Sequence, residues 1–200
     1  MDRLSALTAI VVAVVATLAA CDKGAGDQPP PPGRTNGAKV GSAQKASADA
    51  FCDVHHADDS GPLLQIPPVG EVKAIAKQGR WTWLNIWATW CKPCVEEMPM
   101  IVKWTSEKKF AGVELDALFV SVDENDADIT AFKQAHADLP PTARLADPKV
   151  QPEWFKQLGL DAAPPIPIHV FVSPTGHIRC ARAGSIAAKD AAAIEKLFHE

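Results

Sequence analysis

Two cysteines separated by two residues, Cys91 and Cys94, are the side chains of this sequence best suited to chemistry. A Cys-x-x-Cys pair can close into a small disulfide ring. A first cysteine at a helix N-terminus is stabilised as a thiolate by the helix dipole and by free amide groups. Cys91 is then the nucleophile, and Cys94 can attack a mixed disulfide formed on it. Lys92 adds a nearby positive charge, and Pro93 restricts the loop between the sulfurs.

The same spacing also suits half of a zinc site. A complete site needs a second pair of ligands, which Cys52 with His55 or His56 can supply in principle. A position between a strand and a helix, flanked by Trp90 and Pro93, favours redox chemistry instead. We therefore expect thiol-disulfide exchange at this pair and no metal.

The elements that must position the pair alternate along the chain. The apolar, aromatic-rich run 81–88 predicts a buried central strand, and 91–109 predicts a helix kinked at Pro99. Further strands are expected at 114–122, 168–172 and 177–182, and further helices at 126–136, 153–158 (stopped by Gly159) and 186–199. This order predicts an α/β fold in which helices cover both faces of a sheet with strands of mixed direction.

The run around the cysteines matches a known motif. Residues 85–94 read NIWATWCKPC and residues 97–99 read EMP, which follows the pattern NFWATWCxPCxxEMP. The chain thereby resembles the thioredoxin superfamily, and more closely its exported, membrane-tethered members of the TlpA and ResA type. The resemblance covers roughly residue 81 to the C-terminus. It implies a thioredoxin-like three-layer α/β/α sandwich with a mixed central sheet, Cys91 as attacking thiol, Cys94 as resolving thiol, and no bound cofactor.

A second matching segment surrounds Pro167, just before the expected hairpin, where relatives have a cis-proline motif such as TPTTFLIDPEG. By resemblance Pro167 faces the cysteine pair, and a cis bond there presents neighbouring backbone to an extended substrate. Ile166 replaces the usual Thr. We expect Trp90, Lys92, Pro93 and Ile166 to contact substrate. The alternative for Pro167 is a trans proline in a turn.

Position 85 bears on proton handling, because thioredoxins proper have a buried Asp there and this chain has Asn85. Glu97, one helical turn past Cys94, stands where ResA-type relatives have a Glu near the thiols. It is our candidate proton acceptor or modulator of the thiol pKa, and the alternative is an ordinary solvated helix Glu. His169, two residues beyond Pro167, is expected to have a packing role in its strand, away from or beside the site.

The N-terminal residues have the features of an export signal rather than of a fold. Residues 1–20 contain Arg3 and then an almost uninterrupted apolar run. Residues 18–21, Leu-Ala-Ala-Cys, resemble a bacterial lipobox, in which Cys21 is lipidated; the alternative is an uncleaved transmembrane anchor. Residues 21–50 contain almost no large apolar side chain and predict a disordered tether, so the thioredoxin-like domain is expected at 51–200.

Two cysteines remain once Cys21 takes a lipid and Cys91 pairs with Cys94. In an oxidising compartment we expect Cys52 and Cys180 to form a structural disulfide that joins the N-terminal segment to the hairpin. The alternatives are two buried free thiols, or a metal site of Cys52 with its neighbouring histidines.

Charge and resemblance together narrow the function. The net charge of -4 without a basic block offers no electrostatic footprint for nucleic acid. The resemblance implies a monomeric oxidoreductase, held outside the cytoplasm by its lipid, that takes electrons from a membrane thiol donor. Its substrates would be disulfides of exported proteins, as in cytochrome c maturation.

Two alternative functions of thioredoxin-like proteins need other motifs. A Sco-type copper chaperone uses Cys-x-x-x-Cys, and a peroxidase needs a Pro-x-x-x-Thr-x-x-Cys signature that does not occur here. A non-catalytic binding lipoprotein is a third alternative.

Overall fold

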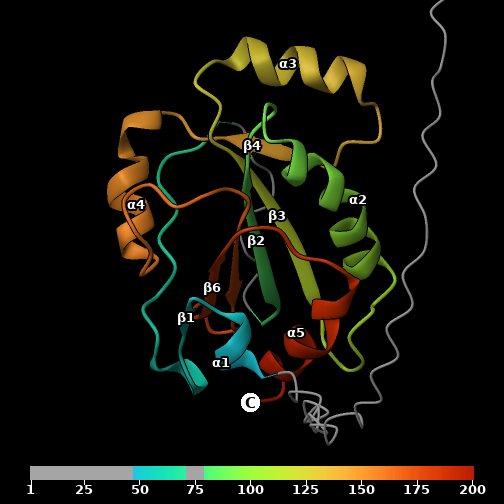
Figure 1. Cartoon of the computed structure of the whole chain (residues 1–200), viewed down its shortest axis with the longest axis vertical. Coiled ribbons are helices and arrows are strands. Elements are labelled where there is room, and N and C mark those ends of the chain that lie inside the picture. The colour runs from blue at the N-terminus through green and yellow to red at the C-terminus, as the bar shows by residue number, and fades with distance from the viewer. Residues whose placement is uncertain (1–46, 71–78) are drawn as a thin grey trace, which may run out of the picture. The chain divides into compact units, whose positions relative to one another are not determined.

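A six-stranded mixed sheet forms the centre of the computed structural model, which describes residues 47–70 and 79–200 (Figure 1). The strands lie in the order β1-β6-β5-β2-β3-β4. They are β1 (Val54–His55), β2 (Trp81–Trp87), β3 (Leu115–Ser121), β4 (Thr142–Arg144), β5 (Ile168–Val172) and β6 (Ile178–Ala183). β2, β3 and β4 are parallel, whereas β5 is antiparallel to both β2 and β6, and β1 is antiparallel to β6.

Helices flank this sheet. They are α1 (Ala48–Phe51), α2 (Lys92–Ser106), α3 (Asp126–Ala135), α4 (Gln151–Gln157) and α5 (Ala191–Leu197), with short 3-10 turns η1 (Asp58–Ser60), η2 (Pro148–Val150) and η3 (Ala188–Asp190). In Figure 1, α2 lies on one side of the strands and α4 on the other. The predicted α/β fold with a mixed central sheet is confirmed.

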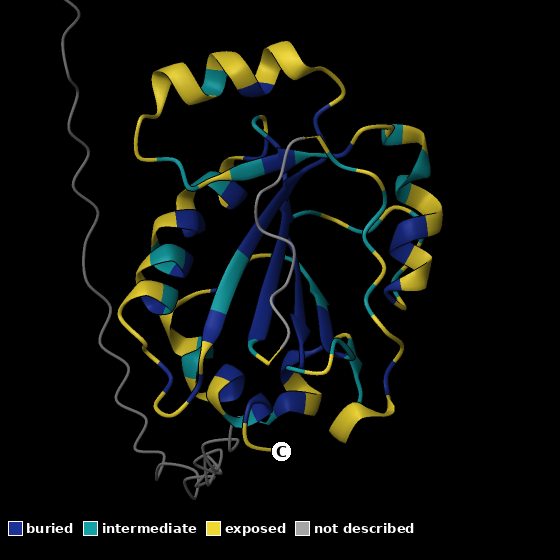
Figure 2. Ribbon diagram, turned by 180° about the vertical axis from the view of Figure 1, so that it is seen from behind, coloured by how far each residue is buried: buried dark blue, intermediate teal, exposed yellow. Residues whose placement is uncertain are grey.

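The central strand β2 is buried along its whole length, and its side chains alternate between the two faces. Trp83 packs against Trp104 of α2 with ring centroids 6.2 Å apart, and Trp87 packs against Phe132 of α3 at 5.6 Å. Asn85, between them, therefore faces the same side. In Figure 2 the central strands are buried, whereas the helices are exposed on the side that faces away from the sheet. β2 thus carries the polar side chain of Asn85 into the core on the face covered by the helix that begins at the cysteine pair.

The sequence did not predict several short elements, among them α1, β1 and β4. Each has only two to four residues and is held by distant partners; for example, Val54 pairs with Ala181 and Thr142 pairs with Phe119. Such segments have too few residues for a periodic pattern to mark them. Residues 48–50, which we assigned to the tether, belong to α1 instead.

Helix ends differ from the predicted ones where the backbone leaves helical geometry. α2 continues through Pro99 but ends at Ser106 rather than 109, and Lys108 has a positive φ of 49°. The helix expected at 186–199 is divided into η3 and α5. Gly159, with φ 82°, follows α4 as predicted, since a glycine adopts this left-handed conformation without steric cost.

The predictions about the N-terminus lie outside the described residues. These are the export signal at 1–20, the lipidation of Cys21 and the tether up to residue 46. The chain divides into two units, and every described residue belongs to the second, Ala43–Glu200. Within 47–70 and 79–200, no helix combines the length and the apolar character needed to cross a bilayer.

Candidate active site

The cysteine pair lies where β2 ends and α2 begins. Cys91 is the N-cap of α2, and its Sγ accepts a hydrogen bond from the amide of Cys94 at 3.3 Å. Pro93 stands in the first turn of α2, where its missing N–H removes no helical hydrogen bond. Cys91 therefore occupies the positive end of the helix dipole, the position that stabilises a thiolate.

The two sulfurs are bonded to each other but differ in accessibility. Cys91 and Cys94 form a disulfide with Cα atoms 5.3 Å apart. Cys94 is 0% exposed, whereas Cys91 is 5% exposed and lines a surface cavity of about 950 Å³. A thiolate or disulfide that enters this cavity meets Cys91 first.

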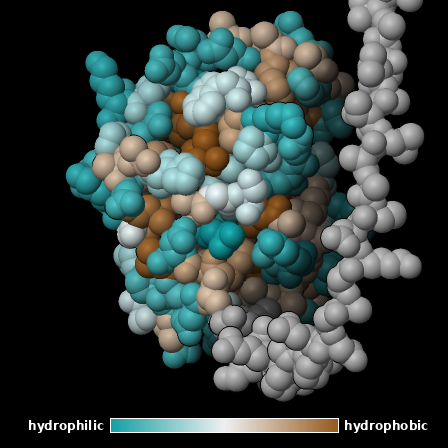
Figure 3. Space-filling model, viewed as in Figure 1, coloured by the Kyte–Doolittle hydropathy of each residue, from teal (hydrophilic) through white to brown (hydrophobic). Residues whose placement is uncertain are grey.

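The cavity brings together the residues expected to contact substrate. Trp90, Lys92, Pro93 and Ile166 all line it. Trp90 is 71% exposed, and the ammonium of Lys92 is paired with Glu96. On the face seen in Figure 3, hydrophobic residues form separate patches among hydrophilic ones. The cavity is lined mainly by apolar and proline side chains, which suits an extended segment of another protein.

The peptide bond between Ile166 and Pro167 is cis. It precedes β5, and the carbonyl oxygen of Ile166 lies 3.7 Å from Cys91 Sγ. The carbonyl oxygen of Pro167 accepts a hydrogen bond from the amide of Gly184 at 2.8 Å, which fixes this segment to the residue that follows β6. Segments 75 residues apart in the chain thus meet at the sulfur of Cys91.

Glu97 is buried one helical turn beyond Cys94, with only 5% of its surface exposed. Its Oε1 accepts a hydrogen bond from Asn85 Nδ2 at 3.2 Å, and its Oε2 accepts one from the amide of Ile186 at 3.0 Å. His169 Nε2 also lies 3.2 Å from Oε1. The alternative of a solvated helix Glu is therefore wrong.

His169 lies inside this polar cluster, which the sequence reasoning missed. Its side chain is 0% exposed, and its ring Nδ1 accepts a hydrogen bond from Trp83 Nε1 at 3.2 Å. The register of β5 places His169 opposite Asn85 of β2. The available signal was a single polar side chain in the otherwise apolar run IHVFV. Only the strand register says which residues that side chain faces.

Asp123, two residues beyond β3, is a second missed residue. Its buried carboxylate accepts hydrogen bonds from the Thr89 amide at 3.0 Å, the Thr89 hydroxyl at 2.7 Å and the Ser121 hydroxyl at 2.6 Å. Thr89 belongs to the loop that leads into Cys91. Asp123 therefore fixes the entry to the cysteine pair from the neighbouring strand.

The other two described cysteines lie apart from this site. Cys52 and Cys180 are joined by a disulfide with Cα atoms 5.5 Å apart, which links the end of α1 to β6. Cys52 is consequently bonded to sulfur and is not a ligand beside His55 and His56.

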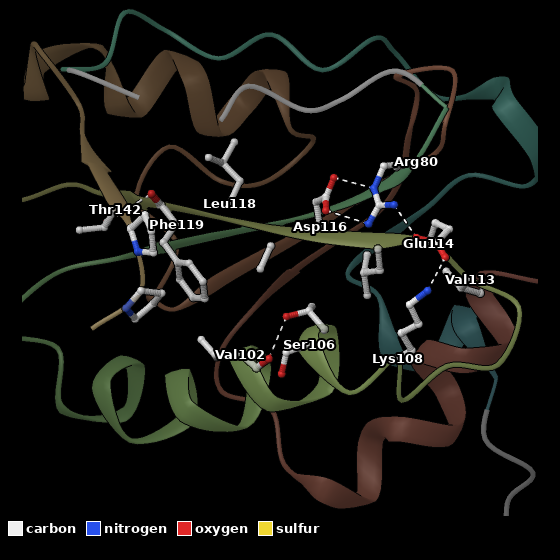
Figure 4. A pocket seen from close by; sticks show the side chains of 15 residues that line it. Arg80, Val102, Ser106, Lys108, Val113, Glu114, Asp116, Leu118, Phe119 and Thr142 are labelled. Atoms are coloured by element: carbon white, nitrogen blue, oxygen red, sulfur yellow. Dashed lines mark hydrogen bonds and ion pairs between the residues drawn. The ribbon is translucent and has the colours of Figure 1, made fainter. Parts of the chain in front are cut away.

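A second cavity, of about 620 Å³, lies along β3 and α2 (Figure 4). At one end Arg80 is paired with Asp116 and Glu114, and Glu114 is paired with Lys108. Hydrogen bonds from Lys108 and Arg80 lower the pKa of Glu114. The other end of this cavity is lined by apolar side chains, among them Val102, Leu118 and Phe119. The predicted site residues do not line this cavity.

Comparisons with known proteins place the chain among its relatives. The profile described as "AhpC/TSA family" matches residues 65–181, more than half of the chain. The chain belongs to the AhpC/TSA family. This family member is 29% identical over 131 residues to thiol-disulfide oxidoreductase ResA of Oceanobacillus iheyensis, which covers 62% of the chain and 64% of that relative. It is 42% identical over 55 residues to ResA of Bacillus thuringiensis subsp. konkukian, which covers 28% and 31% respectively. The chain thus spans less than two thirds of the length of these curated relatives.

A solved structure also resembles this AhpC/TSA-family chain. It is a thiol-disulfide isomerase from Corynebacterium glutamicum, with a TM-score of 0.53 and 15% sequence identity, and the match covers 71% of this chain and 99% of that one. At this identity the similarity concerns the fold alone. Together with the family match, it confirms the predicted thioredoxin-like fold and the predicted kinship with ResA-type members of the thioredoxin superfamily.

Proposed function

We propose that this chain is a thiol-disulfide oxidoreductase that acts outside the cytoplasm and reduces disulfides in exported proteins. The observation that supports this most is the Cys91–Cys94 disulfide at the N-terminus of α2, with its first sulfur in a surface cavity beside the cis bond at Pro167. Both ResA relatives carry the name thiol-disulfide oxidoreductase.

The exchange proceeds in two steps that balance without a bound cofactor. The Cys91 thiolate attacks one sulfur of a substrate disulfide, forms a mixed disulfide and releases the other substrate sulfur as a thiolate. The Cys94 thiol then loses its proton and attacks Cys91 Sγ. This releases the second substrate sulfur and leaves the Cys91–Cys94 disulfide. Two electrons have passed to the substrate, and a membrane thiol donor returns them by the reverse exchange.

Glu97 is the proposed acceptor of the Cys94 proton. It lies one turn further along α2, inside the protein, and the groups that face its two oxygens are N–H donors of Asn85, Ile186 and His169. Such donors match the lone pairs of a carboxylate. Glu97→Gln keeps the size of the side chain and removes the basic oxygen, so it should slow the second step and change its pH profile. An unchanged profile would remove Glu97 from the mechanism.

Substrate contact is proposed for Trp90, Lys92, Pro93 and Ile166. All of them line the cavity next to Cys91. An extended segment can place its disulfide on Cys91 while its backbone lies along the cis-proline segment, in the manner of a strand added to an edge.

The location outside the cytoplasm rests on the N-terminal sequence and on the second disulfide. We propose that residues 1–20 are removed, that Cys21 carries the lipid anchor, and that the mature monomer serves exported proteins such as those of cytochrome c maturation. A Cys52–Cys180 bond is what an oxidising compartment favours. Mass spectrometry of the mature N-terminus tests the anchor: a lipidated Cys21 supports it, and an unmodified Met1 contradicts it.

The activity is tested by insulin reduction with dithiothreitol, together with a redox titration of the pair. Cys91→Ser should abolish reduction of insulin above the uncatalysed rate, while a Ser106→Ala control at the exposed far end of α2 keeps it. A reductant should have a potential near or below about -220 mV, whereas a value near about -120 mV is typical of a strong oxidant and would overturn the assignment.

A further inference from the structure

The groups that surround the ring of His169 indicate which of its two nitrogens carries the proton. Trp83 Nε1 donates to Nδ1 at 3.2 Å, and Asn85 Nδ2 lies 3.4 Å from the same nitrogen. An indole N–H can only donate, so Nδ1 must present a lone pair. The proton of the imidazole is therefore on Nε2, the nitrogen that lies 3.2 Å from Glu97 Oε1.

We propose that His169, fixed as its Nε2–H tautomer by Trp83, is a positioning residue that orients the Glu97 carboxylate to accept the proton of Cys94. This inference rests on the proposed exchange reaction and adds a residue to it. The polar contacts of its ring are with Trp83, Asn85 and Glu97. It acts through Glu97, whose Oε1 faces two N–H groups, from Asn85 and His169, while Oε2 is held by the amide of Ile186.

Among the described residues, Glu97 is the charged group that faces the imidazole of His169. From β6, Arg182 lies opposite His169 in the strand register, but its guanidinium donates to the Phe51 carbonyl and covers the Phe51 ring at 4.8 Å. The side chains that α5 buries are all apolar, and β2 contributes Trp83 and Asn85. The fully buried His169 is thus directed at a single carboxylate among the residues described here.

The step that this arrangement serves is a proton transfer coupled to resolution. The Cys94 S–H bond breaks, its proton passes to a Glu97 oxygen, and the Cys94 thiolate attacks the mixed disulfide on Cys91. In the disulfide state, the contact between His169 Nε2 and Glu97 is a close electrostatic approach rather than an aligned hydrogen bond. Removal of the ring takes one N–H group away from Oε1 and leaves the carboxylate to the donors of Asn85 and Ile186, which hold it less tightly than three groups do.

The test separates the two steps by mixing reduced full-length protein with dithionitrobenzoate in a stopped-flow instrument. Attack by Cys91 releases one thionitrobenzoate, and resolution by Cys94 releases the second. In His169→Leu we expect the second release to slow about tenfold at neutral pH and the first to stay within about twofold, because only the proton acceptor is disturbed. The rate of the second release should also rise more steeply with pH than in the wild type.

Companion variants keep the test independent of folding. His169→Gln, which retains an N–H near the position of Nε2, should recover most of the second rate. Glu97→Gln combined with His169→Leu should be no slower than Glu97→Gln alone, since both act on one acceptor. Phe171→Leu, on the same strand and packed against Trp83, is the matched packing control and should leave the second release unchanged.

The outcomes distinguish this inference from the proposed function. A second release that is unchanged in His169→Leu overturns the inference, and so does one that Phe171→Leu slows equally or that His169→Gln fails to recover. Absence of the first release from the wild-type protein would instead overturn the exchange reaction at Cys91.

Discussion

Loss of the bond between Cys52 and Cys180 should destabilise the fold strongly. The bond joins the end of α1 to β6 across 128 residues of sequence. It therefore restricts nearly the whole described domain in its unfolded state. The double variant Cys52→Ala/Cys180→Ala removes this restriction without leaving an unpaired thiol.

The magnitude follows from the length of the loop. The chain-entropy relation gives about 5 kcal/mol at 25 °C for a loop of 128 residues, and measured disulfides usually contribute about 2 to 4 kcal/mol. We therefore expect the free energy of unfolding to fall by about 2 to 5 kcal/mol. The control Cys91→Ala/Cys94→Ala opens a ring with a sequence separation of 3, for which the same relation gives less than about 2 kcal/mol.

The assay is equilibrium unfolding in guanidinium chloride, followed by tryptophan fluorescence. The Cys52→Ala/Cys180→Ala variant should show a lower midpoint and a larger m-value, because its unfolded chain is free to expand. Equal losses of free energy in the two double variants would refute the loop-closure reasoning. An unchanged midpoint in Cys52→Ala/Cys180→Ala would refute the bond itself.

Three further predictions concern the site and its surroundings. Trp90→Ala should raise KM for a peptide disulfide more than it lowers kcat, because the exposed indole lines the substrate cavity; equal changes in both constants would contradict this. Asp123→Ala should lower the free energy of unfolding by about 1 to 3 kcal/mol, since it leaves the partly buried donors of Thr89 unpaired. Urea denaturation measures this loss, and an unchanged midpoint would show that the loop before Cys91 is held by other contacts. The hydrogen bond and charge of Arg144 lower the pKa of Asp126, whose ordinary value is 3.8. The pair therefore stabilises the fold fully at pH values above 3.8 and loses that effect as the pH falls through the lowered pKa. In Arg144→Gln, an NMR titration should find the pKa of Asp126 back near 3.8; a pKa that stays low would contradict this.

Local patterns were enough to predict the cysteine site. The spacing of Cys91 and Cys94, the apolar run before them and Pro167 before a hairpin all lie within short windows, and β2, α2, β5 and β6 form at these places. The structure of such segments depends mainly on residues nearby in the sequence, so it can be predicted from one sequence.

Contacts that depend on strand register were beyond the reach of the sequence. His169 reaches Glu97 because β5 pairs with β2 so that His169 stands opposite Asn85. Asp123 reaches Thr89 because β3 lies beside β2. A shift of one residue would turn a strand's side chains to the other face. Because β2 and β5 are buried on both faces, no alternation of apolar and polar residues in the sequence fixes that register.

The most direct test of the central claim is the covalent adduct that each single-cysteine variant forms with glutathione disulfide. If Cys91 attacks and Cys94 resolves, Cys94→Ser should retain one glutathione, and peptide mapping by mass spectrometry should place it on Cys91. Cys91→Ser should retain none on the buried Cys94. Glutathione on Cys94 in Cys91→Ser, or none on Cys91 in Cys94→Ser, would contradict the assignment of attacking and resolving thiols.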